Sequence, residues 1–472
     1  MIIHWHRRDL RGPDNRALAR AADTDRVVPV FVFDPTILEH ASPIRVACLR
    51  RALQSLRDWY RDRESELVIA HGEASGVLPE LVDEYDADAV SWNADYSGLA
   101  TERDQAVTAA LEDEGITVRT VHDSVCHEPG SISPNQGEHY SVFSYFWKKW
   151  RDREKQSPFD APTADDLATD SKSLSAVPTL EELGFDEPDA VVPTVTREAG
   201  LERLETFCAE SIGAYDDERD YPARDGTSKL SVHFKWGTLG PREVYSATES
   251  ALEEATADER EGIEAFQRQL AFREFYTHVL AYNPEIVTAN FSGYENRIEW
   301  RNDPDELEAW KAGETGYPIV DAGMRQLLAE GWVHNRVRML VAAFLTKDLL
   351  VDWREGYDWY RQHLADHETA NDVGGWQWAA STGMDAQPYF RVFNPMKQGR
   401  EYDPDATYIK HYIPELEGVS AERSTIGVFS RVRNARTPRP TIRSHSLITA
   451  SAETRQSRRL NGHAVTDRVY KT

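Results

Sequence analysis

Short apolar, β-branched runs alternate with helical patterns through the first third of the chain. The runs with the period of strands are residues 2–5, 27–33, 67–70, 89–92 and 117–121. Between the second and third runs, Ser42 as N-cap and Pro43 in the first turn open a helix that can reach Tyr60. Because strands that alternate with helices form parallel sheets, we predict a doubly wound parallel α/β domain at residues 1–130.

Helical periodicity returns after residues 131–200, a stretch rich in Pro, Ser, Asp and Thr that we interpret as a long interdomain connector. The predicted helices there are residues 242–254, 263–282, 305–311, 320–330, 334–351 and 357–364. We therefore predict an all-helical second domain at residues 201–418. Residues 419–472 remain as an atypical tail.

Charge divides the chain at Gly418. The whole chain has 80 acidic and 54 basic residues, a net charge of −26, yet its last 54 residues hold 11 basic and 3 acidic ones. Arginine outnumbers lysine 43 to 11, and the carboxylate excess predicts a halophilic protein, because a Debye length of about 3 Å in molar salt screens the repulsion. Two hypotheses explain the basic tail: a disordered arm that grips phosphates, or a frameshifted C-terminus.

The cysteines and the apolar runs indicate the compartment. Cys48, Cys126 and Cys208 are too few and too far apart for a disulfide framework or a CxxC metal site, which fits a reducing cytoplasm. No run approaches about 18 apolar residues, so we predict a cytoplasmic protein without a membrane span. We expect no metal site, because His363 and His367 lack the HExxH context of zinc ligands.

Candidate chemistry is concentrated in the helical region, where eight of the thirteen tryptophans lie between Trp236 and Trp378. Core filling is their default explanation. Asn335, Arg338 and Met339 share one face of a predicted helix, which suits a phosphate, a heterocycle edge or a buried ion-pair network. Small hydroxyls in residues 226–231 precede another helix and suit a phosphate, although ordinary helix caps have the same composition.

Seven sequence blocks closely resemble the photolyase/cryptochrome family. They are WHRRDLR at 5–11, ERDYP at 218–222 with GTSKLS at 226–231, REFY at 273–276, TGYPIVDA at 315–322, HNRVRM at 334–339, KDLLVDWR at 347–354 and GGWQWAAS at 374–381. The resemblance covers about residues 1–417 in order and is greatest to microbial cyclobutane pyrimidine dimer photolyases. It implies an N-terminal antenna domain and a helical domain that holds FAD beneath a cavity for a dimer flipped out of DNA.

The resemblance also implies three sets of site residues. FAD phosphates and ribityl chain would be held by Tyr215, Thr227, Ser228, Lys229, Leu230 and Ser231, and the ring and adenine sides by Arg273, Asn335, Arg338, Asp366, Glu368 and Asp372. An electron relay would run through Trp376, Trp353 and Trp300. Damaged DNA would meet Arg219, Gln269, Phe272, Asn335, Arg336, Met339, Trp378 and Gln398. The implied activity is blue-light-driven repair of UV-damaged DNA by a monomeric carbon–carbon lyase.

A few positions depart from the family pattern. Gln269 replaces a substrate-binding Glu and Phe272 a lesion-stacking Trp; the amide still donates and accepts, and the phenyl ring keeps its π-face. Asp372 replaces the Asn that many photolyases have beside the flavin, which resembles plant cryptochromes, so a light sensor without repair is the alternative function. Residues 97–100 lack the Asn-Glu pair of a folate antenna, which leaves a deazaflavin, another chromophore or an empty antenna site.

Overall fold

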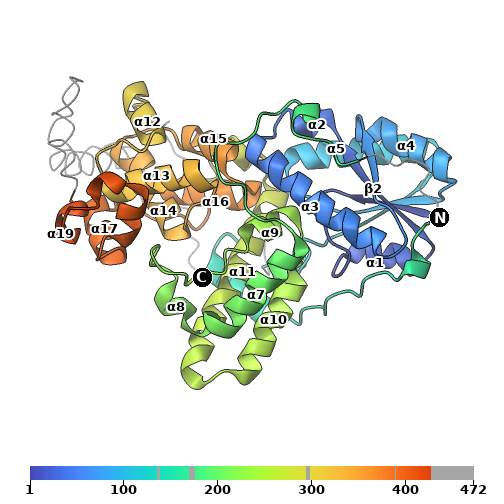
Figure 1. Ribbon diagram of the computed structural model, residues 1–472, viewed down its shortest axis with the longest axis horizontal. Coiled ribbons are helices and arrows are strands. Elements are labelled where there is room, and N and C mark those ends of the chain that lie inside the picture. Colours follow the sequence, from blue (N-terminus) through green and yellow to red (C-terminus); the bar gives the residue numbers. More distant parts are fainter. Residues whose placement is uncertain (135–138, 170–175, 294–297, 389, 427–472) are drawn as a thin grey trace. The chain divides into compact units, whose positions relative to one another are not determined.

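The structure of the protein is a computed structural model that describes residues 1–134, 139–169, 176–293, 298–388 and 390–426 (Figure 1). The chain folds into two compact units. Unit 1 comprises Met1–Asp216, Thr227–Glu285 and Ala365–Ala370, and unit 2 comprises Asp217–Gly226, Ile286–Leu364 and Asn371–Thr472. The two hypotheses about the basic tail concern mainly residues 427–472, which lie outside the described residues.

A five-stranded parallel sheet of order β3-β2-β1-β4-β5 forms the centre of unit 1. The strands are β1 (Ile2–His6), β2 (Val27–Phe33), β3 (Val68–His71), β4 (Ala89–Asn93) and β5 (Thr117–Val121). Ile3 of the central strand pairs with Val28 on one side and Val90 on the other. The predicted parallel α/β architecture is confirmed.

Successive strand residues supply two cores on opposite faces of this sheet. Ile2 and Phe31 face one core, and Ile3 and Val30 face the other. Helices α1 (Arg16–Ala22) and α3 (Pro43–Arg61) cover the first face, and α4 (Ala74–Tyr85) and α5 (Gly98–Asp113) cover the second (Figure 1). Coverage of both faces by helices makes the sheet doubly wound, as predicted.

Helices dominate the rest of the described chain, which confirms the predicted helical region. The further helices that begin in unit 1 are α2 (Pro35–Leu38), α6 (Phe143–Asp152), α7 (Arg197–Glu210), α8 (Tyr215–Glu218), α9 (Ser231–Trp236), α10 (Pro241–Glu254), α11 (Ala257–Tyr282) and α16 (Thr369–Ala380). Those of unit 2 are α12 (Pro304–Lys311), α13 (Pro318–Glu330), α14 (Asn335–Ala343), α15 (Trp353–His363), α17 (Pro395–Tyr402), α18 (Thr407–Tyr412) and α19 (Ala421–Ser424).

Two segments differ from their predicted structure. Residues 131–200 contain helix α6, whose Phe143, Phe146 and Trp150 are buried at the i, i+3, i+7 spacing of one helix face. The helix predicted at residues 334–351 is interrupted: α14 ends at Ala343 and a π-helical turn, Phe344–Asp348, follows. Every residue of that turn is buried, so no exposed polar period marks the change in the sequence.

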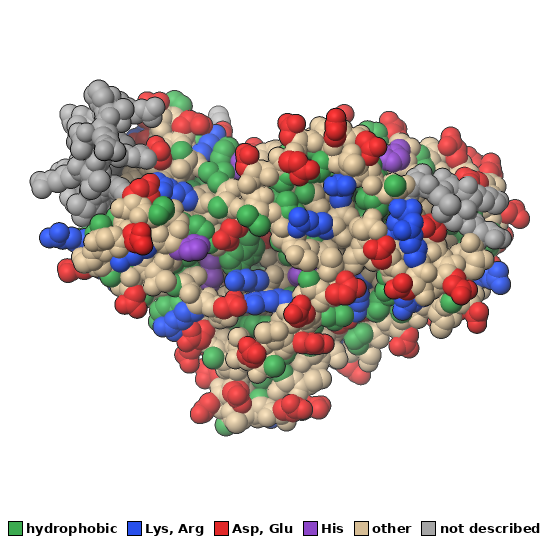
Figure 2. All heavy atoms as spheres, in the orientation of Figure 1, with side chains coloured by type: hydrophobic (Ala, Val, Ile, Leu, Met, Phe, Trp, Pro, Cys, Tyr) green, Lys and Arg blue, Asp and Glu red, His purple; other side chains and the backbone are tan. Residues whose placement is uncertain are grey.

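Charged side chains are spread over the surface, with acidic ones prominent (Figure 2). Figure 2 shows acidic groups over much of the visible face, in line with the net charge of −26. Among the described residues, no helix combines the length and the apolar character needed to cross a membrane.

Four buried charged side chains connect the sheet of unit 1 to helix α10. Arg242 Nε donates to Asp14 Oδ1 at 2.7 Å, and Arg242 and Arg11 each donate from Nη2 to the carboxylate of Asp123. None of these side chains is more than 2% exposed. Arg242 therefore depends on both carboxylates, and Arg11 on that of Asp123, to replace the solvation that water would otherwise supply.

Candidate functional site

The first group of predicted FAD residues lies in unit 1, at and before the start of α9. It consists of Tyr215, Thr227, Ser228, Lys229, Leu230 and Ser231. Arg203 of α7 fixes the turn, because its Nε donates to Ser228 O at 2.9 Å and its Nη2 donates to Thr227 O at 2.5 Å. The Thr227 hydroxyl is buried and has no hydrogen-bond partner among the described residues. Such a hydroxyl is available to a polar ligand.

Helix α11 brings Arg273 and its neighbour Glu274 to the loop after β5. Arg273 Nη1 donates to Ser124 O at 2.8 Å. The Glu274 carboxylate accepts from the backbone N–H groups of Cys126 at 2.7 Å and His127 at 2.9 Å. Burial raises the pKa of Glu274 to about 7, although these two donors oppose the rise. The sequence analysis missed Glu274, because an acidic residue on a helix is usually exposed.

Asp366 and Glu368 also belong to unit 1. Arg8 places Nη1 and Nη2 each 3.3 Å from Glu368 Oε1, and Nη1 lies 3.5 Å from Asp95 Oδ1. Asp366 is buried, with 4% of its surface exposed. The charge of Glu368 is thus balanced by Arg8, and the contact of both acids with FAD stays a prediction.

The second group of predicted FAD residues lies in unit 2, on α14 and α16. Asn335 Nδ2 lies 3.9 Å from Met339 Sδ, which confirms that these residues share one helix face. Arg338 Nε donates to Val333 O at 2.8 Å, and its Nη1 lies 3.8 Å from Asp372 Oδ1. The structure therefore joins the predicted residues Arg338 and Asp372 as an ion pair.

The three predicted relay tryptophans all lie in unit 2. Trp376 and Trp353 are at most 2% exposed, whereas Trp300 is half-buried. The Trp376 ring meets Tyr360 edge-on with centroids 5.1 Å apart and Trp310 at 6.0 Å. Among the described residues, no ring contact joins two of the predicted relay members directly. The path of the relay stays a prediction.

Trp376 packs directly on Gly356 of α15. A Cβ at this position would lie 2.1 Å from Trp376 Cη2 and 2.4 Å from its Cζ3. Atoms at that distance overlap, so only glycine fits beside the ring. A glycine in a helix interior costs about 1 kcal/mol relative to alanine, and here the Trp376 ring explains its presence.

Gln377, the next residue of α16, was also missed by the sequence analysis. Its side-chain amide makes three hydrogen bonds to the backbone of one loop: Nε2 donates to Ile286 O (2.8 Å) and Ala289 O (2.9 Å), and Oε1 accepts from Phe291 N–H (2.9 Å). In that loop, Asn290 Oδ1 accepts from the indole N–H of Trp353 at 2.9 Å. The loop at residues 286–291 thus holds both α16, which carries Trp376, and α15, which begins at Trp353. A glutamine inside the apolar run of α16 was the signal available in the sequence.

Replacing Asn290 with leucine is expected to lower the free energy of unfolding by about 1–3 kcal/mol, because the buried Trp353 indole N–H loses its acceptor. Urea unfolding in high KCl, followed by tryptophan fluorescence, measures this loss. Asn290→Asp keeps an acceptor oxygen and serves as the control. Equal stability of the leucine variant and the wild type would contradict the assignment.

The predicted DNA-contacting residues occur in both units. In unit 1, the Phe272 ring packs 4.1 Å from that of Phe143, and Gln269 is half-buried one turn earlier. In unit 2, Gln398 Nε2 donates to Glu401 Oε2 at 3.3 Å. The others are Arg219 and Trp378, which are half-buried, and Asn335, Arg336 and Met339, which lie on α14. Their contact with DNA stays a prediction.

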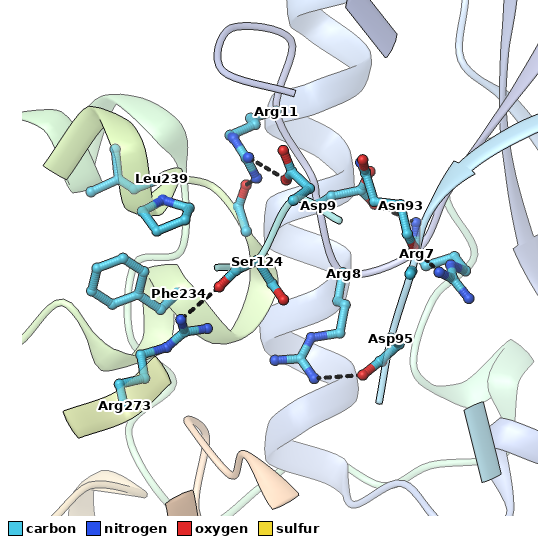
Figure 3. A pocket seen from close by; sticks show the side chains of 14 residues that line it. Arg7, Arg8, Asp9, Arg11, Asn93, Asp95, Ser124, Phe234, Leu239 and Arg273 are labelled. Carbon is cyan, nitrogen blue, oxygen red and sulfur yellow. Dashed lines mark hydrogen bonds and ion pairs between the residues drawn. The ribbon is translucent and has the colours of Figure 1, made fainter. Parts of the chain in front are cut away.

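A pocket lies at the carboxyl edge of the sheet, where β1 and β4 end (Figure 3). Its lining residues are Arg7, Arg8, Asp9, Arg11, Asn93, Ala94, Asp95, Asp123, Ser124, Phe234, Gly237, Leu239, Pro241 and Arg273. The strand order reverses between β1 and β4, and open α/β sheets bind ligands at such a point. The cavity is about 20 Å³, which is room for about one water molecule. No glycine motif follows a strand here, so the sequence did not indicate this pocket.

A buried group of His4, His6 and Asp9 brings possible metal ligands within 4.8 Å of one another. His6 Nε2 lies 2.7 Å from the Tyr60 hydroxyl, and Asn15 Nδ2 donates to Asp9 Oδ2 at 3.0 Å. Burial lowers the pKa of His6 to about 3, which keeps the ring neutral. We assign this group to the hydrogen-bonded core of unit 1.

Comparison with known proteins identifies the family. Residues 2–164 match the family described as DNA photolyase, and residues 266–438 match the FAD binding domain of DNA photolyase. The chain is 55% identical over 436 residues to the deoxyribodipyrimidine photo-lyase of Halobacterium salinarum, covering 89% of this chain and 91% of that protein. It is 40% identical over 457 residues to the deoxyribodipyrimidine photo-lyase of a Synechococcus strain, covering 94% of each. The Halobacterium relative agrees with the predicted adaptation to salt.

Solved structures share the fold. A class III photolyase from Agrobacterium tumefaciens has a TM-score of 0.87 at 32% identity, covering 98% of this chain and 97% of that one. A cryptochrome from Synechocystis has a TM-score of 0.86 at 24% identity, covering 96% and 98%, and is similar in fold alone. The α/β sheet, the helical region and the matched FAD-binding domain define a flavoprotein of the photolyase/cryptochrome class. Within that class, the chain belongs to the DNA photolyase family.

Proposed function

We propose that this chain repairs cyclobutane pyrimidine dimers in DNA under blue light. The 55% identity to a deoxyribodipyrimidine photo-lyase over 89% of the chain carries this proposal. When bound, reduced FAD supplies the electron that opens the cyclobutane ring and takes it back, so no net oxidation results. The protein supplies binding, orientation and the electrostatic environment.

Observations in both units support FAD as the ligand of the predicted residues. In unit 1, the turn held by Arg203 carries the partnerless buried hydroxyl of Thr227, which suits a phosphate or ribityl oxygen. In unit 2, Arg338 brings a cation, balanced by Asp372, to the predicted ring side. We propose that these residues hold the cofactor.

The lesion must leave the base stack to meet a buried flavin, and its weakened pairing lowers the energy of that extrusion. We propose that Gln269 bonds the pyrimidine carbonyls through its amide, which both donates and accepts. The Phe272 ring offers a π-face to the bases, and its packing against Phe143 fixes its orientation. UV-damaged DNA is the partner that these groups fit.

Illumination of dimer-containing DNA with the flavin-reduced protein is expected to remove dimers under blue light and leave them intact in the dark. The assay is run in high KCl, and dimers are counted with a dimer-specific endonuclease. The unreduced protein in the dark is the control. Dimers that persist after illumination would contradict the proposed function.

A light sensor is the second candidate, favoured by the pairing of Asp372 with Arg338 in place of the usual asparagine. A sensor would change its partners or its oligomeric state under light without removing dimers. The repair assay therefore separates the two functions. The names of the relatives at 55% and 40% identity favour repair.

We infer that a second chromophore, if the chain carries one, binds at the sheet-edge pocket. An archaeal photolyase from Sulfolobus tokodaii, with a TM-score of 0.81 at 31% identity and coverage of 97% and 99%, is described as holding two FAD molecules and implying a novel light-harvesting cofactor. The arginines of the pocket suit an anionic ligand, but a flavin-sized ring needs more room than about 20 Å³ and requires side chains to turn outward. Mass spectrometry of chromophores released from the purified protein tests this.

A further inference from the structure

Arg336, which we propose as a DNA contact, is already engaged within unit 2. Its Nη2 donates to the carboxylate of Asp220. Its guanidinium carbon also lies 4.3 Å from the centre of the Tyr402 ring on α17. Only 16% of the Arg336 side chain is exposed, against 35% of Asp220. The cation therefore has two protein partners before any phosphate reaches it.

Neighbouring contacts hold Asp220 at this position. The ring of Tyr221, the next residue, meets the Tyr402 ring with centroids 6.3 Å apart. Arg224 stacks over Tyr221 at 4.0 Å and donates to Glu218 Oε1 at 2.6 Å. The carboxylate is thus presented to the guanidinium by an ordered segment of aromatic and ionic contacts.

A carboxylate beside a DNA-contacting arginine has two electrostatic effects. It neutralises the cation, and it repels any phosphate that approaches the same place. Undamaged duplex DNA binds through its phosphates alone and depends strongly on free positive charge. A flipped-out dimer adds stacking and hydrogen bonds with pocket side chains, which do not depend on that charge. The pair of Arg336 and Asp220 therefore lowers the affinity for both kinds of DNA, and undamaged DNA has no further contacts that compensate for the loss.

We propose that Asp220 withholds Arg336 from DNA phosphates and so keeps undamaged DNA, which binds through its phosphates alone, weakly bound. This inference rests on the proposed function, because DNA with a dimer is the favoured partner.

Replacing Asp220 with asparagine is expected to tighten dark binding to an undamaged duplex about two- to fivefold, the range of a partly exposed ion pair. The slope of log affinity against log KCl should steepen by about 0.9, the value for one further phosphate contact. Binding to the same duplex with one dimer should tighten by a similar factor, because the stacking and hydrogen bonds of the dimer add to the same phosphate contact. Fluorescence anisotropy of both duplexes across a KCl series measures these quantities.

Asp217→Asn removes the same charge from an exposed position on the same segment and is the matched control. In an Arg336→Ala background the effect of Asp220→Asn should vanish. Asp220→Ser repeats the test if the asparagine variant unfolds. The inference is overturned if, with a wild-type protein that repairs dimers, the Asp220 and Asp217 variants show equal slopes and equal affinities for undamaged DNA. A wild type that neither repairs dimers nor prefers damaged DNA would instead overturn the proposed function.

Discussion

Replacing Arg242 with methionine is expected to lower the free energy of unfolding by about 3–5 kcal/mol, the loss typical of breaking a buried ion pair from one side. The Asp14 carboxylate would lose its ion-pair partner at a site that is 1% exposed, and Asp123, which is 2% exposed, would retain only Arg11. Because the network connects α10 to the loops that follow β1 and β5, the loss should affect unit 1 as a whole. Urea unfolding in high KCl, followed by circular dichroism, measures it.

A surface pair provides the control for that substitution. Arg224 donates to Glu218 at 2.6 Å, but both side chains are well exposed to water. Arg224→Met should therefore leave the unfolding midpoint close to that of the wild type. If the Arg242 and Arg224 variants unfold at the same urea concentration, the buried network contributes no more than an exposed pair.

The second large effect concerns pH and Glu274. Burial raises its pKa from 4.5 to about 7, so between these values the folded protein binds a proton that the unfolded chain releases. The contribution of Glu274 to the free energy of unfolding is fully present below pH 4.5. It decreases as the pH rises and is lost above pH 7. The expected total loss is about 3 kcal/mol.

Glu274→Gln isolates this effect, because glutamine keeps one acceptor oxygen for the Cys126 and His127 N–H groups and does not titrate. Unfolding free energies are compared near pH 4 and near pH 8, values chosen to bracket the two pKa values. The fall across this range should be smaller in the variant by about the same 3 kcal/mol. An equal fall in both proteins would show that Glu274 ionises in the fold as it does in water.

The sheet could be predicted because its strands follow a local pattern, namely short apolar, β-branched runs that alternate with helices. Strands such as Val27–Phe33 are apolar throughout, as a strand covered on both faces must be, and Ser42 with Pro43 starts the following helix. Helix α6 was missed because its short apolar face lies within a polar stretch. The break after Ala343 was missed because a buried apolar run has no exposed side from which a period can be read.

The candidate site was predicted from resemblance, and only its local part follows from spacing. The contact of Asn335 with Met339 is a property of any helix and was predictable. Three other contacts join residues that are 24 to 116 positions apart in the sequence. They are the hydrogen bond from Arg203 to Thr227, the hydrogen bonds of the Gln377 amide to the 286–291 loop, and the ion pair of Asp220 with Arg336. Such pairs are set by tertiary packing, which no local pattern encodes.

The contact of Gly356 with Trp376 makes position 356 a marker for comparing relatives. A relative with any larger residue at this position has no room for an indole ring in the same place, unless the two helices lie farther apart. The residue at 356 therefore reports on the ring at 376 without any measurement of light-driven chemistry. Substitutions at positions 356 and 376 should then occur together. A tryptophan introduced at position 376 of a relative that lacks the glycine would not fit there.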